Sequence, residues 1–323
     1  LVELGPGTKT SGLEGSIYLT GPYRGAPFGV ALVFPAKIGP FDLGTMVVRG
    51  AVRIDRLSGR VKIETDPLPR LLEGAAVRFQ SIGLAIDRPG FLHNPTSCAP
   101  RAVAATVTST AGTVAQLSRP YRAPGCVSLP FRPQFSLELR GGTKRKQRPS
   151  LNIAAKIPGG GSNLRAADFT LPKPVAFDVA GLGALCGPGA AQEGSCPGAA
   201  AVGTARARSP LIDTPLSGEV FATRPKQGRL PDLWVNLSGG GIEVAFRIDT
   251  NERHGHAEAA LREVPDVPIK ALRMTLRGGR SGLISLRKNL CGGGRPRAEA
   301  EIEGQNRILL HQHLPLRTSS KCG

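Results

Sequence analysis

Short runs of alternating apolar and polar residues dominate this sequence. In residues 242–249, Ile242, Val244, Phe246 and Ile248 alternate with smaller or more polar residues, and residues 272–277 and 298–303 repeat the pattern. Since successive side chains of a strand point to opposite faces of a sheet, this period of two predicts half-buried β-strands. Further strands are predicted over residues 16–20, 28–34, 45–54, 60–65, 101–109, 135–140 and 151–157.

Glycine and proline separate these runs at short intervals, as at Gly21-Pro22 and Gly278-Gly279. The apolar phase shifts between Phe79 and Ile82, which predicts a β-bulge at Gln80 and Ser81. The Ala-rich segments 199–206 and 257–262 are the only helix candidates, and both are short. The chain is therefore predicted to be all-β, built from tandem β-sandwich-like modules.

An internal repeat is visible in the order of the motifs. Residues 13–20 (LEGSIYLT) match residues 216–223 (LSGEVFAT), and residues 65–69 resemble residues 264–268. Residues 94–98 likewise resemble residues 289–291, and each copy then ends in a second cysteine. The repeat predicts one β module over residues 1–126, a shorter central module over 127–212 and a second copy over 213–323.

Six cysteines fall into three sequential pairs: Cys98 and Cys126, Cys186 and Cys196, and Cys291 and Cys322. Six cysteines allow 15 connectivities, and free thiols or a zinc site are the alternatives to disulfides. No pair has the C-x2-C spacing of common zinc sites. Sequential disulfides are therefore predicted, which favours a secreted or cell-surface location.

The charge changes this picture little. Lys and Arg number 42 against 24 Asp and Glu in 323 residues, a formal net charge of +18. The main basic cluster, residues 144–148, is flanked by glycines and Pro149 and lacks neighbouring aromatics, so it is interpreted as a solvated turn. Specific nucleic-acid binding is not expected, whereas an anionic polymer remains a candidate partner. No apolar run is long enough for a membrane helix, and Leu1 is not followed by a signal peptide, so a removed leader or a longer chain is expected.

Several longer motifs resemble a group of large secreted repeat proteins of high-GC, Gram-positive-type bacteria. The motifs are residues 19–30 (LTGPYRGAPFGV), 39–44 (GPFDLG), 87–91 (DRPGF), 94–98 (NPTSC), 129–135 (LPFRPQF) and 264–268 (VPDVP). The resemblance covers nearly the whole chain and implies an exported, β-rich, multi-repeat protein. It implies no catalytic residue, because no activity is assigned to that group.

Histidine is the strongest candidate for chemistry. His254 and His256 form one H-x-H pair and His311 and His313 another, and each pair would lie on one face of a strand. Two such pairs facing one another would bind zinc or copper, but the simpler interpretation is two solvated pairs. If residues 304–306 close a hairpin, His311 lies near Glu299. No cofactor is predicted.

No combination of residues predicts catalysis, because the chain lacks a G-x-S-x-G motif and Cys98, beside His93, is assigned to a disulfide. The carboxylates Asp66, Asp87, Asp232 and Asp266 mostly adjoin prolines and are interpreted as turn caps. The few aromatics suggest a ligand-binding surface at Tyr23, Arg24, Tyr121 and Arg122, whereas Trp234 is predicted to pack in the core.

The sequence thus predicts a non-enzymatic structural or adhesive segment of a secreted or surface repeat protein, in contact with neighbouring modules of a longer chain. A binding module for anionic or glycan polymers of a cell envelope is the first alternative. A metal-dependent hydrolase that uses the H-x-H pairs is the second.

Overall fold

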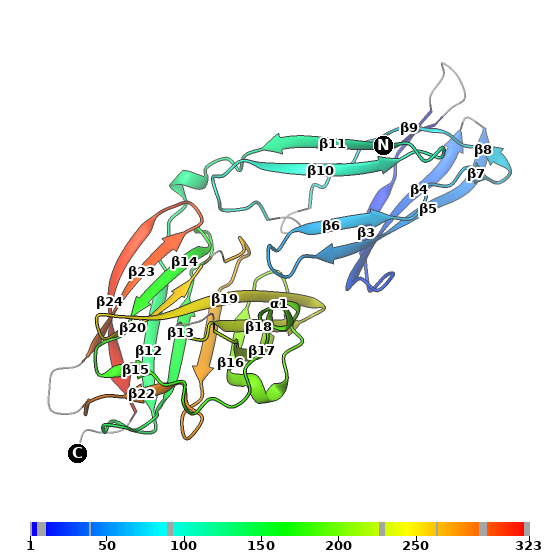
Figure 1. The fold of residues 1–323 in the computed structure, drawn as a ribbon. Coiled ribbons are helices and arrows are strands. Elements are labelled where there is room, and N and C mark those ends of the chain that lie inside the picture. Colours follow the sequence, from blue (N-terminus) through cyan, green and yellow to red (C-terminus); the bar gives the residue numbers. More distant parts are fainter. Residues whose placement is uncertain are drawn as a thin grey trace. The chain divides into compact units, whose positions relative to one another are not determined.

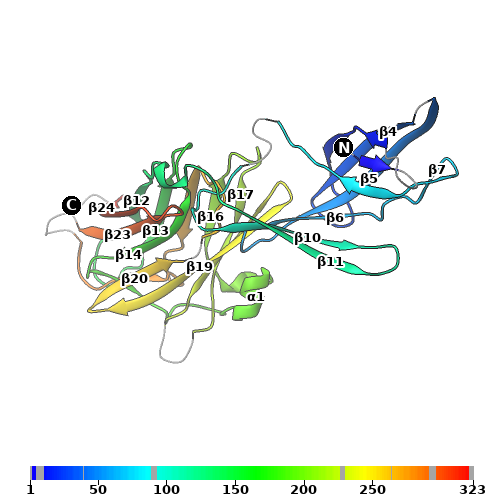
Figure 2. The same ribbon diagram turned by 90° about the horizontal axis from the view of Figure 1, so that it is seen from above.

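The structure is a computed structural model that describes residues 2–4, 11–38, 40–88, 93–225, 230–262, 264–290 and 296–319. It divides into two compact units, residues 1–55 with 60–93 and residues 56–59 with 94–323. Strands dominate both units (Figures 1 and 2). The all-β prediction is confirmed.

The first unit is built around a four-stranded antiparallel meander in the order β3-β4-β5-β6. Leu13, Phe34, Ala36, Met46 and Val48 form its buried core on one face of the meander. A second sheet has the order β2-β1-β9, and Gln80 has no opposite residue where β1 and β9 pair, as the predicted bulge requires. The strands are β1 (Val2–Leu4), β2 (Ser11–Leu13), β3 (Ser16–Thr20), β4 (Phe28–Ile38), β5 (Phe41–Ile54), β6 (Val61–Thr65), β7 (Leu71–Leu72), β8 (Ala75–Ala76) and β9 (Phe79–Ile82).

The second unit contains a closed barrel in the order β12-β13-β21-β16-β17-β18-β19-β20-β14-β23-β24 (Figure 1). Its strands are β12 (Gln134–Arg140), β13 (Ser150–Lys156), β14 (Leu164–Thr170), β16 (Ala201–Arg208), β17 (Leu216–Ala222), β18 (Leu233–Gly239), β19 (Ile242–Arg253), β20 (His256–Leu261), β21 (Ala271–Leu276), β23 (Arg297–Gly304) and β24 (Leu309–Thr318). Outside the barrel lie the hairpin of β10 (Arg101–Thr108) and β11 (Val114–Tyr121) and the pair of β15 (Val175–Phe177) and β22 (Ile284–Leu286).

Alternation explains how the barrel is filled. Along β23 the side chains of Ala298, Ala300 and Ile302 are buried while the residues between them are exposed or half-buried. Buried residues from every barrel strand join one core cluster, with Leu137, Val220 and Leu233 among its most buried members. The barrel interior is therefore a packed hydrophobic core.

The barrel closes where its first and last strands meet. β12 and β24 run parallel, with Leu137 opposite Leu316 and Leu139 opposite Thr318, whereas every other neighbouring pair in the barrel is antiparallel. A single closed barrel replaces the predicted tandem sandwiches in this region, because strands from residues 134–208 insert between strands from residues 216–318.

The predicted module boundaries differ from those of the compact units. The ranges 127–212 and 213–323 lie together in the second unit and share the barrel, and the division of the chain falls near residue 93 rather than at 126. The pairing of β13 with β21 links residues more than a hundred positions apart. Domain boundaries predicted from local motifs do not take such long-range strand pairing into account.

The two Ala-rich helix candidates are strands. Residues 257–262 largely form β20, where Ala257 and Leu261 are buried, and residues 199–206 largely form β16. In β16 the buried alanines Ala205 and Ala207 alternate with exposed residues, so a period of two fits the barrel wall. The described α-helix is α1 (Pro188–Glu193), with Pro at its start and Gly194 in the left-handed conformation at its end. Two short 3-10 helices, η1 (Cys126–Ser128) and η2 (Gly198–Ala200), complete the structure.

The two segments that share the sequence motif of residues 13–20 and 216–223 each lie in a four-stranded meander. The strand order β17-β18-β19-β20 in the barrel matches β3-β4-β5-β6 in the first unit. The shared glycines of the motif, Gly15 and Gly218, have equivalent neighbours. A Cβ at Gly15 would overlap the carbonyl oxygen of Val33 in the next strand, and a Cβ at Gly218 would overlap that of Asn236. Val33 and Asn236 are separated by the same 203 positions as the two glycines.

Two of the three predicted disulfides are present, Cys98–Cys126 and Cys186–Cys196. Cys291 and Cys322 lie outside the described residues. Cys186 and Cys196 pack with Ala191, Phe221 and Trp234 in a small cluster outside the main core. Trp234, predicted to pack in the core, is half-buried and packs against this side cluster rather than in the barrel interior.

Candidate functional site

A basic depression lies beside the pair β15–β22. The loop before β13 runs along β22, and Lys146 donates its backbone N–H to the carbonyl of Leu286 (2.7 Å) while Leu286 donates to that of Gln147 (3.0 Å). Lys146 adopts a positive φ of 67°, which turns the chain there. The depression measures about 390 Å³ and is lined by Arg145, Lys146, Arg148, Asp178, Ser285, Leu286 and Arg287.

Half of the cations around this depression are already paired. Arg148 forms an ion pair with Asp178 (2.6 Å), and Arg287 donates two hydrogen bonds to the Glu252 carboxylate, at 2.6 Å each. The side chains of Arg145 and Lys146 have no hydrogen-bond or ion-pair partner among the described residues. The paired arginines are held in place, and the two exposed cations beside them can contact an anion.

The sequence identified only part of this surface. Of the predicted solvated turn 144–148, residues 144–147 are exposed, whereas Arg148 is half-buried and paired with Asp178. Sequence reasoning missed Arg287, which lies about 140 residues away and directly follows β22, the strand that is hydrogen-bonded to the loop. No local motif could have revealed that neighbour.

A second depression of about 390 Å³ lies on the outer face of the barrel, over β14, β23 and β24. It gathers acidic and imidazole side chains: Asp168, Glu299, Glu301, His311 and His313. Burial raises the pKa of Asp168, and Glu301 and Glu258 raise that pKa further, against the lowering effect of Arg262. Arg262 lies 2.8 Å from the Asp168 carboxylate.

The histidine pairs do not come together as a metal site. In the part of the chain that the structure describes, no group of three His, Cys, Asp or Glu side chains could hold a metal ion. His254 has a positive φ of 49° in the turn before β20, and Nδ1 of His256 is 2.8 Å from the carbonyl oxygen of Leu171. His254 and His256 therefore lie in different local environments.

The predicted neighbour of His311 is wrong by two positions. His311 lies opposite Glu301, with 3.6 Å between Nδ1 and the carboxylate, and His313 lies opposite Glu299. The reason is the position of the turn: Gly304 donates its backbone N–H to the carbonyl of Ile308, so residues 305–307 rather than 304–306 form the turn and the partner of His311 moves by two. Gln305 and Asn306 in this turn are buried, and their side chains donate hydrogen bonds to the carbonyls of Val264 and Leu129.

The four aromatic and arginine candidates are divided between the two units. Tyr23 and Arg24 contribute to a turn in the first unit, where both contact Asp66 at 2.5 Å and 3.0 Å. The Arg49 guanidinium also lies over the Tyr23 ring, 4.0 Å from its centre. The Tyr23 side chain therefore interacts with residues of its own unit, whereas Tyr121 and Arg122 are exposed at the end of β11 in the second unit.

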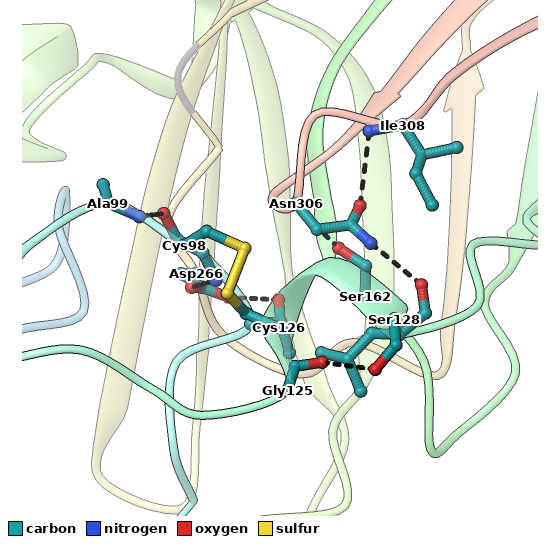
Figure 3. Close-up of a disulfide and its surroundings, with 12 residues drawn as sticks. Cys98, Ala99, Gly125, Cys126, Ser128, Ser162, Asp266, Asn306 and Ile308 are labelled. Carbon is teal, nitrogen blue, oxygen red and sulfur yellow. Dashed lines mark hydrogen bonds between the residues drawn. A yellow bond between two sulfur atoms is a disulfide. The ribbon is translucent and has the colours of Figure 1, made fainter.

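The disulfide Cys98–Cys126 lies beside a buried polar network at the barrel (Figure 3). Asp266 accepts hydrogen bonds from the Thr96 hydroxyl, the Ser97 N–H and the Asn163 side chain, at 2.8 to 2.9 Å. Asn306 donates to the carbonyl of Leu129 (2.8 Å) on the other side of the disulfide. Asp266 is predicted to cap its own turn, but these three partners lie more than a hundred positions away, and it ties the segment before Cys98 to the barrel instead.

Fold and surfaces together define a disulfide-bonded all-β protein with a closed barrel and a modest basic depression. A scan against protein-family models matched none of them, and a search among curated proteins returned no match. No helix in the described part of the chain is long and apolar enough to cross a membrane. Function therefore has to be argued from the architecture itself.

Proposed function

We propose that this chain is a load-bearing structural segment of a secreted or cell-surface repeat protein. The observation that carries the proposal is the parallel pairing of β12 and β24, which closes the barrel. The chain enters β12 at one end of this pair and leaves β24 at the other end. Tension along the chain therefore shears the pair, so that its hydrogen bonds are loaded together rather than one after another.

The disulfide Cys98–Cys126 supports the same role. It bridges 28 positions that include β10 and β11, so tension transmitted along the oxidised chain passes through the disulfide and bypasses that hairpin. Disulfides form and persist in oxidising compartments, which supports the extracytoplasmic location. The twofold occurrence of the meander supports a repeat architecture.

Single-molecule force spectroscopy on the oxidised full chain tests the proposal. Handles at the two termini should give a high-force event for the barrel. The matched control uses handles at Arg297 and Thr318, near the open end of the antiparallel hairpin β23–β24, where bonds unzip successively at lower force. Equal forces in the two geometries would contradict a load-bearing role.

The basic depression favours a second candidate, weak binding of an anionic envelope polymer. Arg145 and Lys146 supply the uncommitted charge. Co-sedimentation with isolated bacterial envelopes should then fall as salt rises, because exposed charges are screened beyond about 8 Å at physiological ionic strength. Replacing both residues with Gln should abolish the binding, whereas the same change at Lys62 and Arg60 in the first unit should not. Binding that persists in the Gln variant would exclude this surface.

A further inference from the structure

The hairpin β10–β11 has a counterpart in the barrel. Pro315 follows Pro120 by 195 positions, and Arg317 follows Arg122 by the same interval. At that interval, Val103, Ala105 and Val107 of β10 correspond to Ala298, Ala300 and Ile302 of β23. β10–β11 therefore matches β23–β24, as the meander β3–β6 matches β17–β20.

The surroundings of the two hairpins differ completely. In the barrel, β23 pairs with β14 along the edge that does not face β24, and β24 pairs with β12 along its other edge. Ala298, Ala300 and Ile302 are buried. β10–β11 forms a two-stranded sheet in which every residue is exposed. Val103 is 65% exposed and Leu117 is 57% exposed, on the same face of the hairpin.

A lone hairpin with an exposed apolar face is marginally stable in water. The face combines Val103, Ala105, Val107, Ala115, Leu117 and Tyr121. Among the residues that the structure describes, no further strand pairs with either outer edge of the hairpin. Unpaired edges and an apolar face are what a strand-adding partner requires.

We propose that β10–β11 is the docking site for a further half-barrel module with the strand pattern of residues 134–170. Its strand equivalent to β14 pairs antiparallel with β10, and its strand equivalent to β12 pairs in parallel with the end of β11. The choice of partner follows from the repeat, because β14 and β12 are the strands that cover the equivalent hairpin. The inference rests on the repeat that also supports the proposed function.

A second copy of the same hairpin is a poorer partner. Arg101 and Arg119 lie on the apolar face, and two copies packed face to face would bring these arginines together. The net charge of +18 adds to this repulsion. β14, in contrast, carries Asp168 as well as Arg165, and β12 carries Glu138 as well as Arg140.

Synthetic peptides of residues 162–172 and 132–142 serve as probes, added to the oxidised full chain. The expected result is slower hydrogen exchange of the β10 amides with the first peptide and of the β11 amides with the second. Scrambled peptides should have no effect. Val107→Arg with Leu117→Arg should abolish the protection, whereas Thr106→Arg, on the opposite face of β10, should preserve it.

Three results would overturn the proposal. The first is unchanged exchange of β10 and β11 at millimolar peptide. The second is protection confined to β23 and β24, which would mean that the peptides compete only for the existing barrel. The third is a dimer of the chain alone that Val107→Arg with Leu117→Arg dissociates, because a second copy would then cover the face. None of these results changes the force asymmetry between β12–β24 and β23–β24, so failure here is distinguishable from failure of the structural role.

Discussion

The meander β3–β6 and the meander β17–β20 have the same strand order and the same motif glycine in two different surroundings. In the barrel, β16 and β14 pair with the outer strands β17 and β20, and the apolar face is buried. In the described part of the first unit, no further strand pairs with the outer strands β3 and β6 of the meander, and only part of the apolar face is covered.

Matched positions show the difference directly. Ala222 is 0% exposed in β17, whereas Leu19, which precedes it by the 203-position interval of the repeat, is 58% exposed in β3. The same local sequence pattern thus forms the same local structure, while burial depends on which strands are added at its edges. The local sequence pattern determines that a meander forms, and pairing with further strands determines how stable it is.

The largest expected effect comes from placing a charge at these two matched positions. Ala222→Asp buries a carboxylate in the barrel and should cost about 4 kcal/mol or more, because no partner offsets its desolvation. Leu19→Asp should stay within about 0.5 kcal/mol, as exposed substitutions do. The fluorescence of the single tryptophan, Trp234, reports barrel unfolding in denaturant, and hydrogen exchange of the β4 and β5 amides reports the first unit. Equal losses at both positions would contradict the difference in burial.

The next largest effect is expected from removing a disulfide, which should lower the stability of the second unit and leave that of the first unchanged. The first unit has no disulfide in its described part, whereas Cys186–Cys196 packs against Trp234 in the second. Replacing both cysteines with Ala should lower the free energy of unfolding seen by Trp234 by about 2–3 kcal/mol, on the chain-entropy model for a short loop. Exchange of the amides in β4 and β5 should not change, and faster exchange there would contradict the separation.

The motif glycines should respond alike in both copies. Gly15→Ala and Gly218→Ala each place a Cβ against a neighbouring carbonyl oxygen and should each cost about 1–3 kcal/mol by overpacking. Gly21→Ala is the control, because a Cβ there meets nothing within 4 Å. Thermal unfolding measures all three variants. A loss at Gly218 alone would mean that the two glycines do not share a structural role.

The smallest effect concerns β14, the strand that pairs with β20. The pKa of Asp168 is raised in the folded state, so ionisation of this residue opposes folding as the pH rises through that pKa. Asp168→Asn should therefore stabilise the barrel at neutral pH, by no more than about 0.5 kcal/mol, and should have no effect at a pH well below 3.8, where Asp168 is protonated in both states. Destabilisation by this variant at neutral pH would show that the ion pair with Arg262 outweighs burial.

Local patterns predicted most of the strands and both described disulfides. The alternation along residues 242–249 and 298–303 places apolar side chains on one face, which is the information a strand carries by itself. Closure of the barrel could not be predicted, because it depends on pairings such as Leu137 with Leu316 between distant segments. The Ala-rich segments misled for the same reason, since alanine suits either structure until its neighbours are known.

The candidate surfaces divide along the same line. The exposed turn at residues 144–147 follows from its flanking glycines and proline, whereas the contribution of Arg287 depends on the pairing of two distant segments. Tyr23 illustrates the opposite outcome, because a residue chosen for ligand stacking is occupied by Asp66 and Arg49 of its own unit. Composition identified the residue types, and tertiary structure decided which of them stay free.

Hydrogen exchange of the oxidised full chain, resolved by residue, tests most directly whether one meander occurs in two surroundings. The inner strands β4, β5, β18 and β19 should all exchange slowly, because each pairs on both sides. In β17 and β20 consecutive amides should be protected, whereas in β3 and β6 protected amides should alternate with fast ones, because only one side of each strand is paired. Uniform protection of β3 and β6, equal to that of β17 and β20, would contradict the account.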